Sequence, residues 1–164
     1  MQRRTIAAGL VLGVPFALDL VVKSLAQQWL VYGEPWAIVL GFNLTLLFNP
    51  GVSFGLFPVG SATGLVVMMT LQAMLCFGIA LYAWAQREKA IVWPLLLLLS
   101  GAIANLVDRF MNGAVTDYLD FYVGTLHWPA FNLADIWITL GVAGLIAAEY
   151  VLKPKDIQRF DKSE

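Results

Sequence analysis

The chain has few charged residues, one cysteine and one histidine. Only 13% of its 164 residues are charged, whereas 60% are hydrophobic, and the mean hydropathy is +0.76. This composition excludes an ordinary soluble domain and indicates an integral membrane protein. The formal net charge is −1. We therefore expect no nucleic-acid partner, because such a partner calls for an excess of basic residues.

The single cysteine and the single histidine argue against a disulfide within the chain and against a zinc site, so we expect neither. Cys76 cannot form a disulfide within the chain, and its apolar surroundings predict a buried, inert thiol. His127 has no second histidine or cysteine at the spacing of a zinc site. We interpret His127 as a residue at the membrane interface, and we predict neither a metal site nor a cofactor.

Four apolar segments are each about as long as a helix that crosses a bilayer, which needs roughly 20 residues. The sequence therefore predicts an all-α membrane protein with four transmembrane helices, in which 1–164 form one membrane domain. The first segment has no convincing cleavage site for a secretory signal, so we interpret it as a retained helix. The expected helices cover about 6–24, 61–85, 90–111 and 131–152, with longer connections at 25–60 and 112–130.

The basic residues predict how the helices are oriented. Connections 25–60 and 112–130 contain no lysine or arginine. By the positive-inside rule, both termini are then cytoplasmic and these two connections face outward. The basic residues lie before the first helix, between the second and third, and after the fourth: Arg3, Arg4, Arg87, Lys89, Lys153, Lys155, Arg159 and Lys162.

The connection between the first and second helices has a strand-like pattern. Segment 37–48 is rich in β-branched and aromatic residues that partly alternate with small or polar ones, which suggests one or two short strands. We expect a small extracytoplasmic β element that rests on the bilayer surface. The segment that follows, 49–55, is rich in turn-forming residues.

Asp117 and Asp135 stand at the two ends of the connection before the fourth helix, eighteen positions apart. We therefore expect both carboxylates at the same face of the membrane. Two neighbouring aspartates tend to share one proton, and the resulting acid and base suit the hydrolysis of an amide by water. Alternatively, both Asp117 and Asp135 are carboxylates at the ends of a loop, solvated among the lipid headgroups.

Further polar residues lie within the apolar segments, where each is costly unless it is paired or functional. Asp19 and Lys23 are four residues apart, so we expect a structural ion pair. Asn132 precedes Asp135 by three positions and can also cap the fourth helix. The third helix carries three polar residues on one side, which should face the interior of the bundle: Asn105, Asp108 and Arg109.

These residues lie in five blocks, and Asp19…Lys23 is the first. The others are Asn49-x-Gly51-x-x-Phe54, Gly101-Ala102-x-x-Asn105-Leu106-x-Asp108-Arg109, Gly113-x-Val115-x-Asp117-Tyr118 and Phe131-Asn132-Leu133-Ala134-Asp135. Together, and in this order, they resemble the motifs of signal peptidase II, the lipoprotein signal peptidase family. The departures are mild: Val52 and Ser53 replace small residues, Ala104 replaces a common glycine, and Leu20 replaces a frequent glutamine.

The resemblance implies a bacterial intramembrane aspartic endopeptidase. Enzymes of this family cut the signal peptide from diacylglyceryl-modified prolipoproteins just before the lipidated cysteine. The expected location is the cytoplasmic (inner) membrane, with several passes and an extracytoplasmic active site. The expected partners are these prolipoproteins, membrane lipid and globomycin-type inhibitors.

The resemblance also assigns roles to residues. It implies that Asp117 and Asp135 are the catalytic pair. It further implies that the substrate site is lined by Asn49, Gly51, Asn105, Arg109 and Asn132, and that Asp19, Lys23 and Asp108 support it.

Two other functions are compatible with a small polytopic membrane protein. A proton- or ion-coupled transporter predicts polar residues through the whole membrane depth or an internal repeat. The sequence has neither, and the second helix carries almost no polar residues. A structural subunit would leave the clustered Asn, Asp and Arg residues unexplained.

Overall fold

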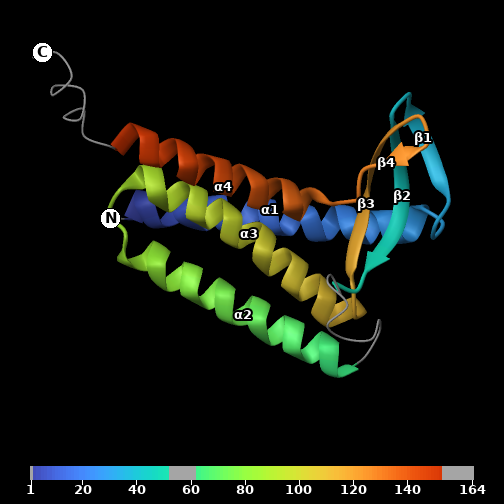
Figure 1. The fold of residues 1–164 in the computed structure, drawn as a ribbon. Coiled ribbons are helices and arrows are strands. Elements are labelled where there is room, and N and C mark those ends of the chain that lie inside the picture. The colour runs from blue at the N-terminus through green and yellow to red at the C-terminus, as the bar shows by residue number, and fades with distance from the viewer. Residues whose placement is uncertain (1, 52–61, 153–164) are drawn as a thin grey trace, which may run out of the picture.

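Four long helices and a small sheet make up the computed structural model, which describes residues 2–51 and 62–152. The sheet lies at one end of the helix bundle, and the N-terminus lies at the other end (Figure 1). The helices are α1 (Gln2–Trp29), α2 (Ala62–Ala85), α3 (Lys89–Asn112) and α4 (Leu133–Leu152). Each is long and apolar enough to cross a membrane.

Helix α3 is the central element of the bundle, because it contacts α1, α2 and α4. It approaches α4 closely at Gly101, where an added Cβ would collide with the carbonyl oxygen of Ala134. Only glycine permits this approach. The contact therefore places the polar turn of α3 directly beside the first turn of α4.

The sheet is antiparallel, and its strands follow the order β1-β2-β3-β4. Strands β1 (Pro35–Val39) and β2 (Phe42–Asn49) come from the connection between α1 and α2, as the sequence predicted. Strands β3 (Val115–Val123) and β4 (Leu126–His127) come from the connection between α3 and α4, for which no strand was predicted. Asp117 is therefore a strand residue paired with Leu47, and the loop-end alternative for it is wrong.

Helix α1 is longer than predicted at both ends, since it already begins at Gln2, and helix α4 begins later than predicted. Helix α1 continues past Ser24 to Trp29, because the intervening Leu, Ala and Gln residues are good helix formers. Helix α4 begins at Leu133 rather than at Phe131, because Asn132 caps it. The predicted start of the second helix at Ser61 and part of the second motif, including Phe54, lie outside the described residues.

Candidate active site

Asn132 connects the two aspartates. Its Nδ2 donates a hydrogen bond to Oδ1 of Asp117 at 2.6 Å, and its Oδ1 accepts one from the backbone N–H of Asp135 at 3.1 Å. Oδ2 of Asp135 in turn accepts a hydrogen bond from the backbone N–H of Asn132, also at 3.1 Å. This reciprocal pair is a capping box at the start of α4. Asn132 thus caps the helix, and it contacts the carboxylate of Asp117 through its side chain and that of Asp135 through its backbone N–H.

Asn105 holds Asp135 from the opposite side. Its Nδ2 donates to Oδ1 of Asp135 at 2.9 Å, while its Oδ1 accepts a hydrogen bond from Nζ of Lys23 at 2.6 Å. An ammonium group can only donate, so Lys23 determines which end of the amide faces Asp135. Both oxygens of Asp135 therefore accept hydrogen bonds, which fixes the orientation of the carboxyl group.

Lys23 also joins the two supporting carboxylates. Its Nζ lies 2.8 Å from Oδ2 of Asp19, so the expected ion pair is present, and 3.3 Å from Oδ2 of Asp108. All three side chains are at most 2% exposed. A buried charge is costly unless it is paired, so the loss of any one of these side chains would destabilise the others. We call Asp19, Lys23 and Asp108 the Lys23 unit.

Each supporting carboxylate holds the residue that precedes a predicted catalytic aspartate. Asp108 accepts a hydrogen bond from the backbone N–H of Thr116 at 2.7 Å, next to Asp117. Asp19 accepts one from the backbone N–H of Ala134 at 2.8 Å, next to Asp135. The Lys23 unit therefore fixes the backbone on both sides of the site.

Burial controls the protonation of Asp117, which is only 3% exposed. Burial is the main cause that raises the pKa of Asp117 from its usual 3.8 to about 6, and the nearby charge of Asp135 adds to the rise. Hydrogen bonds from the side chains of Asn132 and Asn49 partly oppose it. A carboxyl with such a pKa exchanges its proton near neutral pH, as an acid or base in catalysis must.

Arg109 is the cation beside the pair. Its Nη1 donates to Oε1 of Gln72 at 2.6 Å, and its side chain is only 6% exposed. Its Nε is buried and has no hydrogen-bond partner among the described residues. A buried guanidinium donor without a partner is well suited to bind a substrate carbonyl oxygen.

Asn49 and Gly51 form the edge of the site at the end of β2. Oδ1 of Asn49 accepts a hydrogen bond from the backbone N–H of Gly51 at 2.8 Å, which closes a tight turn. Gly51 has a φ of +74°, and an added Cβ would collide with the side chain of Met68 and lie 3.0 Å from Nη2 of Arg109. Glycine is therefore required here both for its backbone conformation and for space.

The structure thus brings every predicted site residue to one end of the bundle, and it adds residues that the sequence reasoning missed. Gln72 of α2 fixes Arg109 and also donates to the carbonyl of Ala102 at 2.9 Å. The signal was available, because Gln72 is the only side-chain amide in the apolar run of α2. Tyr118 was part of a motif without an assigned role, and its hydroxyl accepts a hydrogen bond from the backbone N–H of Leu133 at 3.2 Å.

Comparisons with known proteins agree with this arrangement. The family model for signal peptidase (SPase) II matches residues 11–151. The lipoprotein signal peptidase of Francisella tularensis subsp. tularensis (strain SCHU S4 / Schu 4) is 37% identical over 142 residues, which cover 85% of this chain and 88% of that protein. The lipoprotein signal peptidase of Hydrogenovibrio crunogenus is 38% identical over 151 residues, which cover 90% of this chain and 87% of that protein.

The fold also has a solved counterpart. A bacterial membrane enzyme, determined by the in meso method at 1.9 Å resolution, superposes with a TM-score of 0.76. The alignment covers 90% of this chain and 93% of that one, at 24% sequence identity. At this level of identity, the comparison supports the fold of four helices with a small sheet.

Proposed function

This chain belongs to the signal peptidase II family of peptidases, which cleave lipoprotein signal peptides, and we propose that Asp117 and Asp135 are its catalytic acid and base. The observation that carries this proposal is the position of Asn132, which hydrogen-bonds to both aspartates. The substrate is a prolipoprotein whose cysteine carries a diacylglyceryl group, and the cut falls just before that cysteine.

The proposed reaction is a direct attack by water on the scissile amide. One aspartate is ionised and takes a proton from the water as its oxygen adds to the carbonyl carbon. The other aspartate is protonated and donates its proton to the developing oxyanion. The first aspartate then gives the proton it took from water to the amine as the C–N bond breaks, and the second aspartate recovers its proton as the carbonyl re-forms. The products are a carboxyl on the signal peptide and an amine on the cysteine. Because the pair shares one proton, its titrations belong to both residues.

The surrounding polar groups position the substrate. The Nε of Arg109, which has no partner among the residues that the structure describes, is available to bind a backbone carbonyl near the scissile bond. Asn49, Gly51, Asn105 and Asn132 line the same site, so we expect globomycin-type inhibitors to occupy it too. Donors that are already held in place stabilise the developing negative charge without a further cost of reorganisation.

The proposed orientation places the active site at the extracytoplasmic face of the bacterial cytoplasmic membrane. The absence of Lys and Arg from 25–60 and 112–130 supports this orientation, together with cytoplasmic termini. The substrate's anchor and signal helix then both remain in lipid, while the cleavage point reaches the polar end of the bundle.

The decisive experiment is cleavage of a synthetic diacylglyceryl prolipoprotein by the purified protein in lipid. We expect Asp117→Asn and Asp135→Asn each to reduce kcat by roughly 10³-fold or more, because each removes the acid or the base. Glu34→Gln is the matched control, since Glu34 is an exposed carboxylate in the outer connection, and it should cleave normally. Near-normal cleavage by both aspartate variants would show that other groups carry the chemistry.

A further inference from the structure

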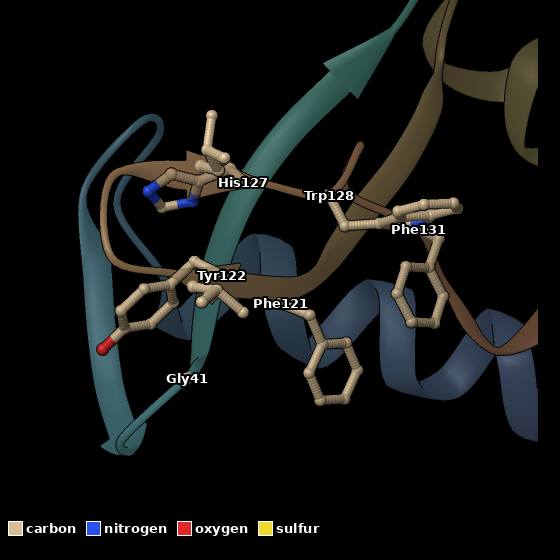
Figure 2. A pocket seen from close by; sticks show the side chains of 8 residues that line it. Gly41, Phe121, Tyr122, His127, Trp128 and Phe131 are labelled. Atoms are coloured by element: carbon tan, nitrogen blue, oxygen red, sulfur yellow. The ribbon is translucent and has the colours of Figure 1, made fainter.

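A large aromatic cavity lies beside the sheet, at the approach to α4. Its volume is about 710 Å³, within the range of sites that bind small molecules. Figure 2 shows the rings of Phe121, Trp128 and Phe131 toward one end, and those of Tyr122 and His127 toward the other. None of the roles proposed above uses these side chains.

This cavity adjoins a second cavity that is lined by Asp135 of the proposed active site. A neighbouring cavity of about 330 Å³ is lined by Asp135, Ile136, Thr139 and Leu140. Trp128 and Phe131 line both cavities. An apolar path therefore leads from the Asp135 carboxylate in two directions: along α4 toward the middle of the membrane, and past Trp128 toward the sheet.

The two directions match the two sides of the scissile bond. The signal peptide precedes the cut and spans the membrane, so it fits the direction along α4. The lipidated cysteine follows the cut, so its lipid fits the direction toward the sheet. We propose that the aromatic cavity between the sheet and α4 binds the diacylglyceryl group of the substrate, an inference that rests on the proposed catalytic role of Asp135.

The side chains that line the cavity favour an uncharged lipid over an anionic one. Among the described residues, none that lines the cavity is a lysine or an arginine, so these residues offer no fixed cation to a phosphate group. A diacylglyceryl thioether is uncharged and needs only apolar contact and room for its esters. The chemistry of the cavity therefore favours the neutral lipid of the substrate over an anionic phospholipid.

The tips of the two hairpins give the acyl chains a route to the bilayer. Val123 and Leu126 line the cavity and are largely exposed, and Leu40 at the neighbouring hairpin is 97% exposed. So much contiguous apolar exposure marks a surface that contacts another apolar phase. Acyl chains leaving the cavity would pass these side chains into the outer leaflet.

The cavity is held in shape before any ligand binds. Nδ1 of His127 lies 2.8 Å from Oδ1 of Asp120, and the other oxygen of Asp120 accepts hydrogen bonds from Asn43 at 3.1 Å and Thr45 at 3.3 Å. The ring of His127 also stacks on Tyr122, with centroids 5.3 Å apart. A preformed wall reduces the entropic cost of binding a flexible lipid.

Photo-crosslinking tests the location of the lipid without depending on catalysis. The probe is a prolipoprotein peptide whose acyl chains carry a diazirine near the ester, bound to the unmodified full chain in nanodiscs. We expect crosslinks concentrated in residues 121–131. Crosslinks confined to the lipid-facing sides of the helices would overturn the proposal, whether or not the aspartates prove to be catalytic.

A kinetic experiment tests specificity. We compare kcat/KM for a dipalmitoyl substrate with that for a dibutyryl substrate of the same peptide. Trp128→Ala should lower this ratio by about tenfold, because the long chains lose an aromatic contact. The matched control is Trp84→Ala, since Trp84 is 91% exposed and lies at the opposite end of α2 from the sheet, and it should preserve the ratio. An unchanged ratio in Trp128→Ala would overturn the proposal. If that variant does not fold, Phe121→Ala takes its place.

Discussion

Asn132 shows how much one side chain contributes to the site. Its side-chain Nδ2 donates to Asp117 and its Oδ1 accepts from the backbone N–H of Asp135. An apolar replacement would lose both hydrogen bonds, and a carboxylate could keep only the second, because it accepts but does not donate. Its side chain is completely buried, so water cannot substitute for the lost contacts. A cap residue of α4 is thereby also the geometric link of the proposed catalytic pair.

Asp117 makes the stability of the protein depend on pH. Its pKa of about 6 in the folded state lies above its usual 3.8, so folding favours the protonated form. The resulting stabilisation is complete below the lower value and is lost as the pH rises through the higher one. We therefore expect the melting temperature of Asp117→Asn, relative to that of the unmodified chain, to rise between about pH 4 and pH 7.

The measurement is thermal unfolding of both proteins in the same detergent across that pH range. The Asn side chain does not titrate, so the difference between the two curves reports the buried carboxyl. A constant difference from acid to neutral pH would show that Asp117 ionises as readily in the folded protein as in the unfolded chain.

At the scale of elements, the contact between α3 and α4 sets the position of Asp135. An added Cβ at Gly101 would collide with the carbonyl oxygen of Ala134, the residue before Asp135. We expect Gly101→Ala to destabilise the protein by about 1–3 kcal/mol and to lower cleavage, because α4 must move away. Gly78 of α2 has open space at its Cβ position, so Gly78→Ala is the matched control.

Thermal unfolding and cleavage assays of both glycine variants show whether the effect of Gly101→Ala comes from the close contact between α3 and α4 or from any added methyl group in a helix. Gly78→Ala should be as stable as the unmodified chain or more so, by up to about 1 kcal/mol, because alanine favours a helix. If Gly101→Ala keeps full activity and stability, the close approach of the helices does not position the first turn of α4.

The sequence predicted some elements and not others for physical reasons. The four helices follow from apolar length, and β1 and β2 follow from alternating β-branched and aromatic residues. Strand β3 was not predicted, because Asp117 and Asp120 interrupt the pattern of apolar residues that would indicate a strand. Those charges become tolerable only through contacts with distant residues such as Asn132 and Asn43, and these contacts cannot be read from local pattern.

The same distinction applies to the site. The i, i+3 and i, i+4 spacings correctly placed Asn105 with Arg109, and Asn132 with Asp135. Spacing within a helix could not show that Lys23 contacts Asn105, because their pairing depends on how α1 packs against α3. The role of Gln72 was missed for the same reason, since its partner Arg109 lies on another helix.

At the scale of the whole molecule, the proposed orientation can be tested by labelling single cysteines. In a Cys76→Ala background, Thr125→Cys lies in the exposed turn between β3 and β4, and Glu88→Cys lies in the exposed turn before α3. We expect a membrane-impermeant maleimide to label Thr125→Cys in intact spheroplasts and Glu88→Cys only after lysis. The reverse pattern would place the proposed site on the cytoplasmic side.

The hydrogen bond from Ala134 to Asp19 spans 115 positions of the chain, and it has a consequence for biosynthesis. The first helix leaves the ribosome early, yet its carboxylate has no partner at the start of α4 until nearly the whole chain has been made. A nascent chain with three inserted helices has the Lys23 unit but lacks both Asn132 and Asp135. With the catalytic roles proposed for Asp117 and Asp135, proteolytic activity begins only when the last helix docks, and an unfinished chain then cannot cut substrates in the membrane around it.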